Sequence, residues 1–390
     1  MFVPVLLGLD LAALSVATSV HECFGIKSHA FGRYRCGISF FSSIMKTHTI
    51  PDLLDENTAR DALVDFAKKQ KKPCLLIPTT DWYLDLVQTL QGELSPYYKM
   101  VIPEKGLYRQ LSDKERFYTL LDSFHLPHPK TDAFSIGERP PWDIYPCVLK
   151  PSSSVEAQKR AFEGQKKVYI IDNREQLEQT LDLLNKHQAG MRYLLQPYIN
   201  AEKSFVLSVF CQENFGTRHA SLAEVAVEER GDSSRGNYCA LLVRELNETA
   251  RKLIAFCDSI GYEGVANFDI IRREGKDYIL EMNPRMGRSS DYLRGAGHSV
   301  ADFIFKSQNR SIAYPEGFSS VPIYWRCIQD REVLALSPKE LHDTIRERIR
   351  MNFAFSPFSY GKNVLHPLES LYRFLHVLRR SRVARAEQRS

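Results

Sequence analysis

Two apolar segments flank the tetrapeptide Arg273-Glu-Gly-Lys276, and this pattern constrains the fold of the chain more than any other. Apolar runs on either side of a short Gly-containing turn predict a β-hairpin. Asp269 and Glu281 lie about equally far from the turn, so we expect them to face each other across the two strands. Asn283, two residues beyond Glu281, should point to the same side of the sheet.

Two facing carboxylates repel each other unless a cation lies between them. Asp269 also interrupts the apolar run Val265–Ile271, where an acid is disfavoured. The alternative, a surface hairpin with solvated acids, does not explain that interruption. A hard divalent cation such as Mg²⁺ or Mn²⁺ prefers oxygen ligands and also binds phosphate oxygens. We therefore predict a metal site formed by Asp269, Glu281 and Asn283.

The residues after the hairpin carry a family resemblance. Asp…Glu-x-Asn-Pro-Arg followed by Arg-Ser-Ser resembles the metal site of ATP-grasp ligases, which include carbamoyl-phosphate synthetase and D-alanine–D-alanine ligase. Five segments, in the same order, resemble the D-aspartate ligase branch of the ATP-grasp carboxylate–amine ligases: Gly8–Asp10, Val148–Val155, Lys166–Val168, Gly236–Tyr238 and Gly287–Gly297. The resemblance covers residues 3–305. Met286 departs from that branch near the expected carboxylate pocket.

The resemblance implies an α/β (α+β) ATP-grasp fold, in which two lobes sandwich ATP behind an N-terminal Rossmann-like domain. We expect the N-terminal domain at residues 1–104, the small lobe at 105–198, the large lobe with the metal hairpin at 199–320, and a C-terminal extension with a basic tail at 321–390. The sequence itself predicts strands at Val3–Leu7 and Lys27–Phe31 around a helix at Leu11–Phe24. The dinucleotide motif Gly-x-Gly-x-x-Gly is absent there, so no dinucleotide site is implied.

A second candidate site follows a strand predicted at Tyr145–Lys150. Lys150 ends that strand and precedes Ser152, Ser153 and Ser154. A lysine above a loop rich in hydroxyl and amide groups suits phosphate oxygens, although many strands end in a lysine without any such role. The resemblance implies that Lys150, the serines, Lys114 and Lys167 contact the nucleotide phosphates.

The segment Gln196-Pro197-Tyr198-Ile199 resembles the hinge that takes the adenine ring between the two lobes. Pro197 replaces the acid that is common in the family, which removes one N–H and one carboxylate. Glu202 is the candidate for the ribose hydroxyls.

Arg285 and Arg288 suit an anionic substrate beside the metal, since guanidinium groups pair with carboxylates and phosphates in a bidentate manner. By resemblance they would hold an acyl phosphate and the substrate carboxylate, with further substrate contacts at Asp10, Asn237 and Ser289. Asp10 and Asp81 each precede a predicted helix, and for both we favour helix capping over binding of a substrate amine.

The resemblance implies that D-aspartate is activated by ATP at its β-carboxyl and joined to the lysine side chain of a UDP-MurNAc-pentapeptide, a peptidoglycan precursor. Two alternatives stay open. One is an ATP-grasp ligase for another amino acid and amine, and the other is a nucleotide-binding scaffold without turnover. Neither the composition nor the motifs indicate a nucleic-acid partner.

The eight cysteines are scattered without a Cys-x-x-Cys pair, which favours a reducing, cytoplasmic setting. The apolar N-terminal segment lacks a basic start, and Asp10 interrupts it, so we expect neither a signal peptide nor an anchor. The net charge of +5 is concentrated after Arg373. We expect this tail to be a solvated terminus; contact with a membrane surface or with an anionic precursor is the alternative.

Three further expectations concern local structure. Ser112-Asp-Lys-Glu115 should be a capping box that opens a helix through Phe124. Short helices are expected at Pro338–Arg350 and Pro367–Arg382. The aromatic stretch Phe353–Tyr360 should pack into a core, although ligases of this kind are often dimers and the stretch also suits a homodimer interface.

Overall fold

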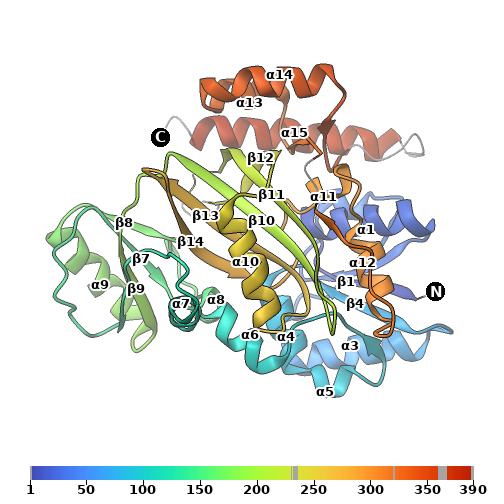
Figure 1. Ribbon diagram of the computed structural model, residues 1–390. Coiled ribbons are helices and arrows are strands. Elements are labelled where there is room, and N and C mark those ends of the chain that lie inside the picture. Colours follow the sequence, from blue (N-terminus) through green and yellow to red (C-terminus); the bar gives the residue numbers. More distant parts are fainter. Residues whose placement is uncertain (1, 230, 232–235, 319–320, 359–366, 388–390) are drawn as a thin grey trace.

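A computed structural model describes residues 2–229, 231, 236–318, 321–358 and 367–387. Within these residues, the strands form three sheets, and helices from distant parts of the sequence cover them (Figure 1). The mixed α/β class that the resemblance implied is confirmed. No helix in the described part of the chain combines the length and the apolar character needed to cross a bilayer.

The N-terminal sheet is entirely parallel and has the strand order β3-β2-β1-β4-β5. Its strands are β1 (Val3–Leu7), β2 (Ser28–Gly32), β3 (Met45–Thr49), β4 (Cys74–Pro78) and β5 (Tyr98–Lys99). The connecting helices are α1 (Leu11–Phe24), α2 (Gly37–Phe40), α3 (Glu56–Lys68), α4 (Asp81–Thr89) and α5 (Gln91–Leu94). Parallel strands that alternate with helices confirm the predicted Rossmann-like opening.

The second sheet is antiparallel, with the order β6-β9-β7-β8. It comprises β6 (Asp132–Ser135), β7 (Cys147–Pro151), β8 (Tyr169–Ile171) and β9 (Arg192–Pro197), with α8 (Ser154–Lys159) and α9 (Arg174–Gln188). The short strand β8 pairs antiparallel with β7 at the edge of this sheet. Leu177, Leu181 and Leu184 follow one face of α9 and are buried in the core of this sheet.

The third sheet has the order β14-β13-β10-β11-β12-β16-β17, with β15 paired to β11. Its strands are β10 (Lys203–Gln212), β11 (Gly216–Glu228), β12 (Tyr238–Arg244), β13 (Gly264–Arg273), β14 (Lys276–Asn283), β15 (Gly317–Phe318), β16 (Tyr324–Arg326) and β17 (Ala354–Phe355). The helix α10 (Glu248–Ser259) covers one face (Figure 1). The helices α6 (Lys105–Ser112) and α7 (Lys114–Ser123) pack in that same core, although the predicted division assigned residues 105–126 to the small lobe.

The hairpin β13–β14 turns at Glu274 and Gly275, both of which have positive φ, as a tight two-residue turn requires. From the turn the pairing is regular up to Ile270, which pairs with Ile279. Asp269 then pairs with Glu281, so Leu280 is an extra residue that forms a β-bulge in β14. The predicted pairing of Asp269 with Glu281 is therefore confirmed, and the bulge is what produces it.

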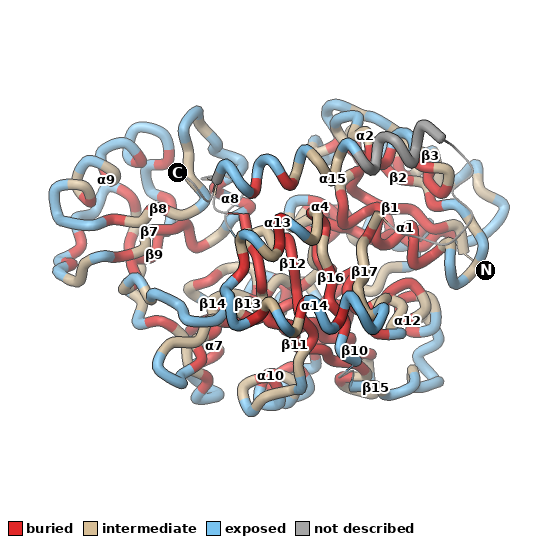
Figure 2. Tube along the Cα trace, turned by 90° about the horizontal axis from the view of Figure 1, so that it is seen from above, coloured by how far each residue is buried: buried red, intermediate tan, exposed pale blue. Residues whose placement is uncertain are grey.

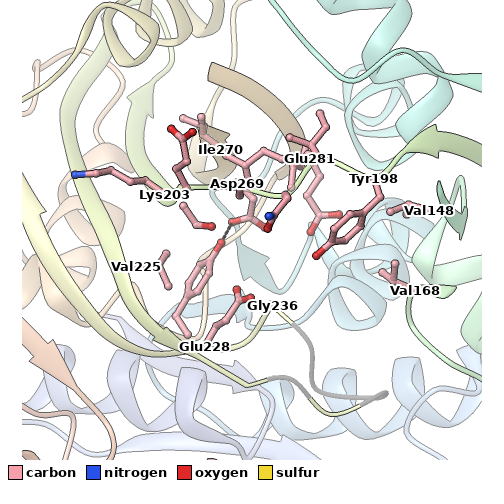
Figure 3. Close-up of a pocket in the computed structure, with 18 of the residues that line it drawn as sticks. Val148, Val168, Tyr198, Lys203, Val225, Glu228, Gly236, Asp269, Ile270 and Glu281 are labelled. Carbon is pink, nitrogen blue, oxygen red and sulfur yellow. Dashed lines mark hydrogen bonds between the residues drawn. The ribbon is translucent and has the colours of Figure 1, made fainter. Parts of the chain in front are cut away.

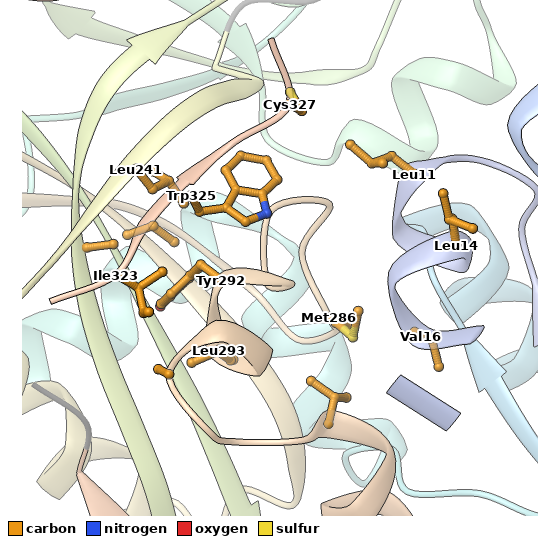
Figure 4. Close-up of a cluster of buried hydrophobic side chains, with 14 of the residues drawn as sticks. Leu11, Leu14, Val16, Leu241, Met286, Tyr292, Leu293, Ile323, Trp325 and Cys327 are labelled. Carbon is orange, nitrogen blue, oxygen red and sulfur yellow. The ribbon is translucent and has the colours of Figure 1, made fainter. Parts of the chain in front are cut away.

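The largest core joins the N-terminal domain to the third sheet (Figure 4). Leu11 and Leu14 of α1 lie in the same cluster as Leu241 of β12 and Trp325 of β16, and the cluster extends to α12 (Val300–Ser307) and the short helix α11 (Tyr292–Gly295). Met286 is also buried in this cluster. The side chain that sequence reasoning assigned to the carboxylate pocket therefore packs in the hydrophobic core.

The segment after residue 320 belongs to the packed structure. The strands β16 and β17 extend the third sheet, and α13 (Asp330–Leu336), a 3₁₀ turn (Lys339–Leu341) and α14 (His342–Arg350) follow its edge. The last helix, α15 (Pro367–Glu387), lies beside α13 and over α2, with buried and exposed residues alternating along its second half (Figure 2). Ser381 and Ala384 are buried, so the expected solvated tail is wrong for this part of the chain. Arg389 and residues 359–366, including part of the aromatic stretch, lie outside the described residues.

Two predicted helix caps are wrong. The side chain of Asp113, not Ser112, accepts the capping hydrogen bond at the start of α7, because Ser112 ends the preceding helix α6. Thr80, not Asp81, caps α4. Asp10 does cap α1, as expected, through the backbone N–H of Ala13. The carboxylate of Asp81 instead forms an ion pair with Arg285.

Candidate active site

A cavity of about 1200 Å³ opens between the second and third sheets (Figure 3). Val148 and Tyr198 from the small sheet lie on one side of it, and Asp269, Ile270 and Glu281 from the hairpin lie on the other. Its wall contains both polar and apolar side chains. This combination suits a ligand with one aromatic and one charged part.

The predicted acidic pair lies in the wall of this cavity. The side-chain amide nitrogen of Asn283 donates to a carboxylate oxygen of Asp269 and to one of Glu281, each at 3.4 Å, while its amide oxygen accepts from Arg285. The hydroxyl of Tyr238, on β12 of the same sheet, donates to Asp269 at 2.8 Å and so helps to fix that carboxylate. The hairpin thus brings all three predicted metal-ligand residues together.

Lysines surround the acidic pair. Lys114, at the start of α7, lies with its ammonium group 3.1 Å from Glu281 and donates to the hydroxyl of Ser154 at 3.3 Å. Lys150, at the end of β7, donates to the hydroxyl of Tyr118 at 3.3 Å. Lys167 also lines the cavity. The three lysines come from three elements of the chain and converge on one side of the hairpin.

Burial and mutual repulsion shift the pKa values of these groups in opposite directions. Burial, together with the neighbouring Lys114, lowers the pKa of Lys150 to about 7. Burial and the facing Glu281 raise the pKa of Asp269. Burial alone would raise the pKa of Glu281 as well, but Lys114, Lys167 and Lys150 outweigh it and hold that pKa well below its usual range. Such opposed shifts within one cavity are typical of functional sites.

The three serines after Lys150 do not act as a group. Only Ser154 lines the cavity. Ser152 is fully buried, donates to Asp113 at 2.9 Å and accepts from the backbone N–H of Glu115, so it fastens α7 to the end of β7. Ser153 caps α8 through the N–H of Glu156. The phosphate contacts expected of Ser152 and Ser153 stay a prediction, and in this structure both hydroxyls are engaged in local structure.

The predicted hinge lines the cavity along its whole length, from Gln196 to Ile199. The side chain of Gln196 donates to Thr131 at 2.8 Å, and the backbone N–H of Tyr198 is bonded to the carbonyl of Pro146. Glu202, also in the wall, accepts from the backbone N–H of Glu274 at 3.3 Å, which links the hinge to the hairpin turn.

Arg285 is held by a carboxylate that sequence reasoning had assigned to a helix cap. Its guanidinium forms two bonds of 2.6 Å with the two oxygens of Asp81 and a third of 3.3 Å with Asn283. Asn267 donates from its side-chain amide to the backbone carbonyl of Arg285 at 3.0 Å. A Cβ at Gly287 would lie 2.7 Å from that amide nitrogen, so a glycine is required there. The arginine is thereby oriented beside the acidic pair.

Arg288 lies further from the hairpin. Its guanidinium is 3.4 Å from a carboxylate oxygen of Glu229, and the side chain of Asn237 donates to the other oxygen of Glu229 at 2.9 Å. Burial raises the pKa of Asp10, while Arg288 and Arg285 act against that rise. Ser289 is buried at the start of a tight turn, where its carbonyl accepts from the N–H of Tyr292. Asp10 and Asn237 therefore lie with the arginines.

Four residues of the site were missed or misassigned: Asp81, Tyr118, Tyr238 and Asn267. Tyr238 stands in one of the quoted segments, but nothing in the sequence indicates a contact with Asp269. Asn267 is an amide in an apolar strand, and that signal, which also singled out Asp269, was sufficient to identify it. Asp81 and Arg285 are separated by 204 residues, so local patterns carry no information about their pairing.

The donor set fits a divalent cation with oxygen ligands. Two carboxylates and one amide converge, and no group of three His, Cys, Asp or Glu side chains converges among the described residues. A site with so few protein ligands leaves positions for water and phosphate oxygens, which is the usual arrangement for Mg²⁺.

The chain contains an ATP-grasp domain, since residues 111–289 match the sequence profile of that domain. It is a carbon–nitrogen ligase of the ATP-grasp class. Among individual proteins it resembles D-aspartate ligase of Enterococcus faecium (strain Aus0004), with 28% identity over 319 residues that cover 78% of this chain and 76% of the relative.

Solved structures agree on the fold. The biotin carboxylase domain of Hydrogenobacter thermophilus 2-oxoglutarate carboxylase, in complex with MgADP, ADP and bicarbonate, has a TM-score of 0.60 and 17% identity over 81% of this chain and 72% of its own. The L-amino acid ligase of Bacillus licheniformis has a TM-score of 0.57 and 13% identity over 78% of this chain and 73% of its own. The predicted ATP-grasp fold is confirmed.

Proposed function

We propose that this protein uses ATP and Mg²⁺ to activate a carboxylate as an acyl phosphate, which an amine then attacks to form an amide. The observation that carries the proposal is the partly buried Asp269–Glu281 pair, which lines the same cavity as Lys114, Lys150 and Lys167. Opposed carboxylates suit a divalent cation, and the lysines suit the phosphates that the cation would share with them.

Each group has a defined task in this proposal. Asp269, Glu281 and Asn283 would hold Mg²⁺, which neutralises charge on the β- and γ-phosphates during transfer. Lys114 and Lys150 position the phosphate chain, and phosphate binding favours the charged form of Lys150. The hinge at Gln196–Ile199 holds the adenine.

The part of the site that contains Arg285 and Arg288, the arginine end, would bind the acid substrate. Arg285, fixed by Asp81, points a preorganised guanidinium at the position where the carboxylate receives the phosphoryl group. The amine displaces phosphate from the acyl phosphate, so no protein nucleophile is needed.

For the substrates, we propose D-aspartate as the acid and the lysine side chain of a UDP-MurNAc-pentapeptide as the amine. The similarity to a D-aspartate ligase supports this pair. The same likeness supports a cytoplasmic role in peptidoglycan synthesis, where the nucleotide-linked precursor would be the partner.

The test measures phosphate release from ATP and Mg²⁺ with D-aspartate and the pentapeptide precursor, followed by mass spectrometry. We expect release coupled to a product heavier by one dehydrated aspartate. Release only with other acids would discard the cell-wall substrates but keep the ligase. A lack of release with every acid would contradict the ligase and favour a nucleotide-binding scaffold.

A further inference from the structure

The helix α15 places an arginine against the candidate site. Arg380 forms an ion pair with Glu229, the same carboxylate that lies 3.4 Å from Arg288. Arg380 lies outside the segment that matches the ATP-grasp domain, which ends at residue 289. A residue distant in sequence thus joins the arginine end of the site.

The hydrogen-bonding capacity of this cluster is not filled. Within the described residues, Nε of Arg380 and Nε2 of His376 are buried without a hydrogen-bond partner, and so is Nη2 of Arg288, which lies 3.4 Å from Glu229 in an ion pair. Buried polar atoms in native proteins are almost always bonded to protein, water or a ligand. Three such nitrogen atoms in one cluster, two of them on guanidinium groups, indicate a place for an anion.

Other atoms of the two arginine side chains remain accessible to solvent. The side chains of Arg288 and Arg380 retain 25% and 13% of their exposure. Glu229 is followed closely by Gly231 and Gly236, both of which line the cavity, and Asn237 bonds Glu229 directly. The cluster therefore lies immediately beside the cavity that contains the acidic pair.

The charged groups near this cluster favour an amino acid over an acid that lacks an amino group. Asp10 lies within electrostatic reach of both Arg285 and Arg288, and burial raises its pKa. Burial and the surrounding guanidinium groups lower the pKa of His376 to about 4, so this imidazole is neutral at neutral pH. An ammonium group would pair with Asp10, which interacts electrostatically with Arg288 and Arg285, and a carboxylate would pair with Arg288 and Arg380.

We propose that Arg380 and Arg288 bind the carboxylate of the acid substrate that is not activated, while Arg285 faces the carboxylate that is. This inference rests on the proposed function and deepens it, because it makes the substrate a dicarboxylic amino acid and makes α15 part of its binding site. Asp10 is then available for the substrate's ammonium group.

The experiment compares Arg380→Gln with Arg382→Gln, an exposed arginine on the same helix. Phosphate release is measured while D-aspartate, ATP and the acceptor are varied in turn. We expect Arg380→Gln to raise the KM for D-aspartate about tenfold or more, as the loss of a charge-assisted hydrogen bond predicts, with the KM values for ATP and acceptor unchanged. Arg382→Gln should leave all three unchanged.

Glu229→Gln separates binding from structural support. If Arg380 only stabilises the fold through Glu229, both variants should impair the enzyme alike. If Arg380 binds the substrate, Glu229→Gln should lower the KM for D-aspartate, because it removes a carboxylate that competes with the substrate for Arg288 and Arg380. Should Arg380→Gln fail to fold, Arg380→Lys keeps the charge, and its expected smaller rise in the KM for D-aspartate takes its place.

An unchanged KM for D-aspartate in Arg380→Gln would overturn the inference, and so would a rise confined to the acceptor, which would assign the cluster to the precursor's diphosphate. Calorimetric titration of D-aspartate in the presence of MgADP needs no turnover. Binding by the wild type that Arg380→Gln abolishes would support the inference even if phosphate release failed and the proposed function fell with it.

Discussion

The two ends of the candidate site hold charge in opposite ways. At the hairpin, the acidic pair faces lysines whose ammonium groups are partly desolvated, and the pKa values of Lys150 and Asp269 move toward neutrality. At the other end, Arg285 already forms a bidentate pair with Asp81 at 2.6 Å. At the hairpin, groups of like charge lie close together. At the other end, the charge of Arg285 is already balanced by the carboxylate of Asp81.

The difference follows from the side chains. Lysine is a compact charge whose pKa falls on burial, whereas arginine keeps its charge and fixes geometry through its planar fork. The hairpin end therefore suits groups that must accept a metal and phosphates in each cycle. The arginine end suits a substrate that must be oriented in one way.

The strongest test of this contrast is Glu281→Gln, which removes half of the acidic pair. We expect kcat to fall by about 10³ or more, because the loss of one preorganised electrostatic group has effects of that order. Phosphate release should be compared with Glu274→Gln, an exposed acid in the turn of the same hairpin. Near-normal turnover in Glu281→Gln would remove the basis for a metal at this end.

Lys150→Met should weaken the binding of ATP but stabilise the folded protein at neutral pH. We expect ATP affinity to fall by about 30-fold, since one charge-assisted contact with phosphate is lost. The folded-state pKa of Lys150 is below its unfolded value of 10.5, so the folded protein is penalised at and below pH 7, and the penalty fades as the pH rises toward 10.5.

Thermal unfolding should therefore show Lys150→Met to be more stable than wild type at pH 7, by about 4 kcal/mol, and the gap should close at alkaline pH. Lys186→Met, on an exposed position of α9, is the matched control and should show no gap. A constant difference across the pH range would mean that the charge of Lys150 carries no folding penalty.

Asp81→Asn removes one charge from the Asp81–Arg285 pair. Because Asp81 orients Arg285 without facing the cavity itself, we expect kcat/KM for the acid to fall by about 10- to 100-fold, the range found for residues that support a functional group. The KM for ATP should not change. Asp61→Asn removes an exposed acid of the same domain and should have no effect. An equal loss in ATP affinity would mean that the two ends are not separable.

Arg385→Gln should have the smallest effect. Arg385 pairs with the buried Glu332 at 2.6 Å, but nearly half of its side chain is exposed, so solvent weakens the pair. We expect a decrease in Tm of about 2 °C and unchanged kinetics. A change in the KM for the acid would show that α15 acts as one unit and not through Arg380 alone.

The contrast between the two ends also explains which residues of the site could be predicted from the sequence. Asp269 is visible because a carboxylate in an apolar strand is anomalous, and Lys150 because it ends a strand before a polar loop. For the serines after Lys150, composition alone is not enough, because local hydrogen bonds decide where each hydroxyl points. Ser152 and Ser153 have the right composition for a phosphate loop, yet their hydroxyls are bonded to Asp113 and to the N–H of Glu156.

The arginine end is hidden for a different reason. Arg285 depends on Asp81, and Arg288 shares Glu229 with Arg380, so each pair joins segments that are far apart in sequence. Periodicity and capping rules describe neighbours along the chain only. They predicted the alternation of strands and helices in the first sheet and a helix at Pro367–Arg382, but they treated the basic end of that helix as solvated.

The extra residue in β14 has a consequence for anyone who transplants or redesigns this site. Without the bulge at Leu280, strict alternation would turn Glu281 and Asn283 toward the core that Ile279 and Met282 occupy. The bulge lets Leu280 and Glu281, two consecutive residues, both line the cavity. An idealised hairpin with the same ligands in a regular ladder would retain every residue of the site and lose the site itself. A graft must therefore copy the irregular spacing as well as the side chains.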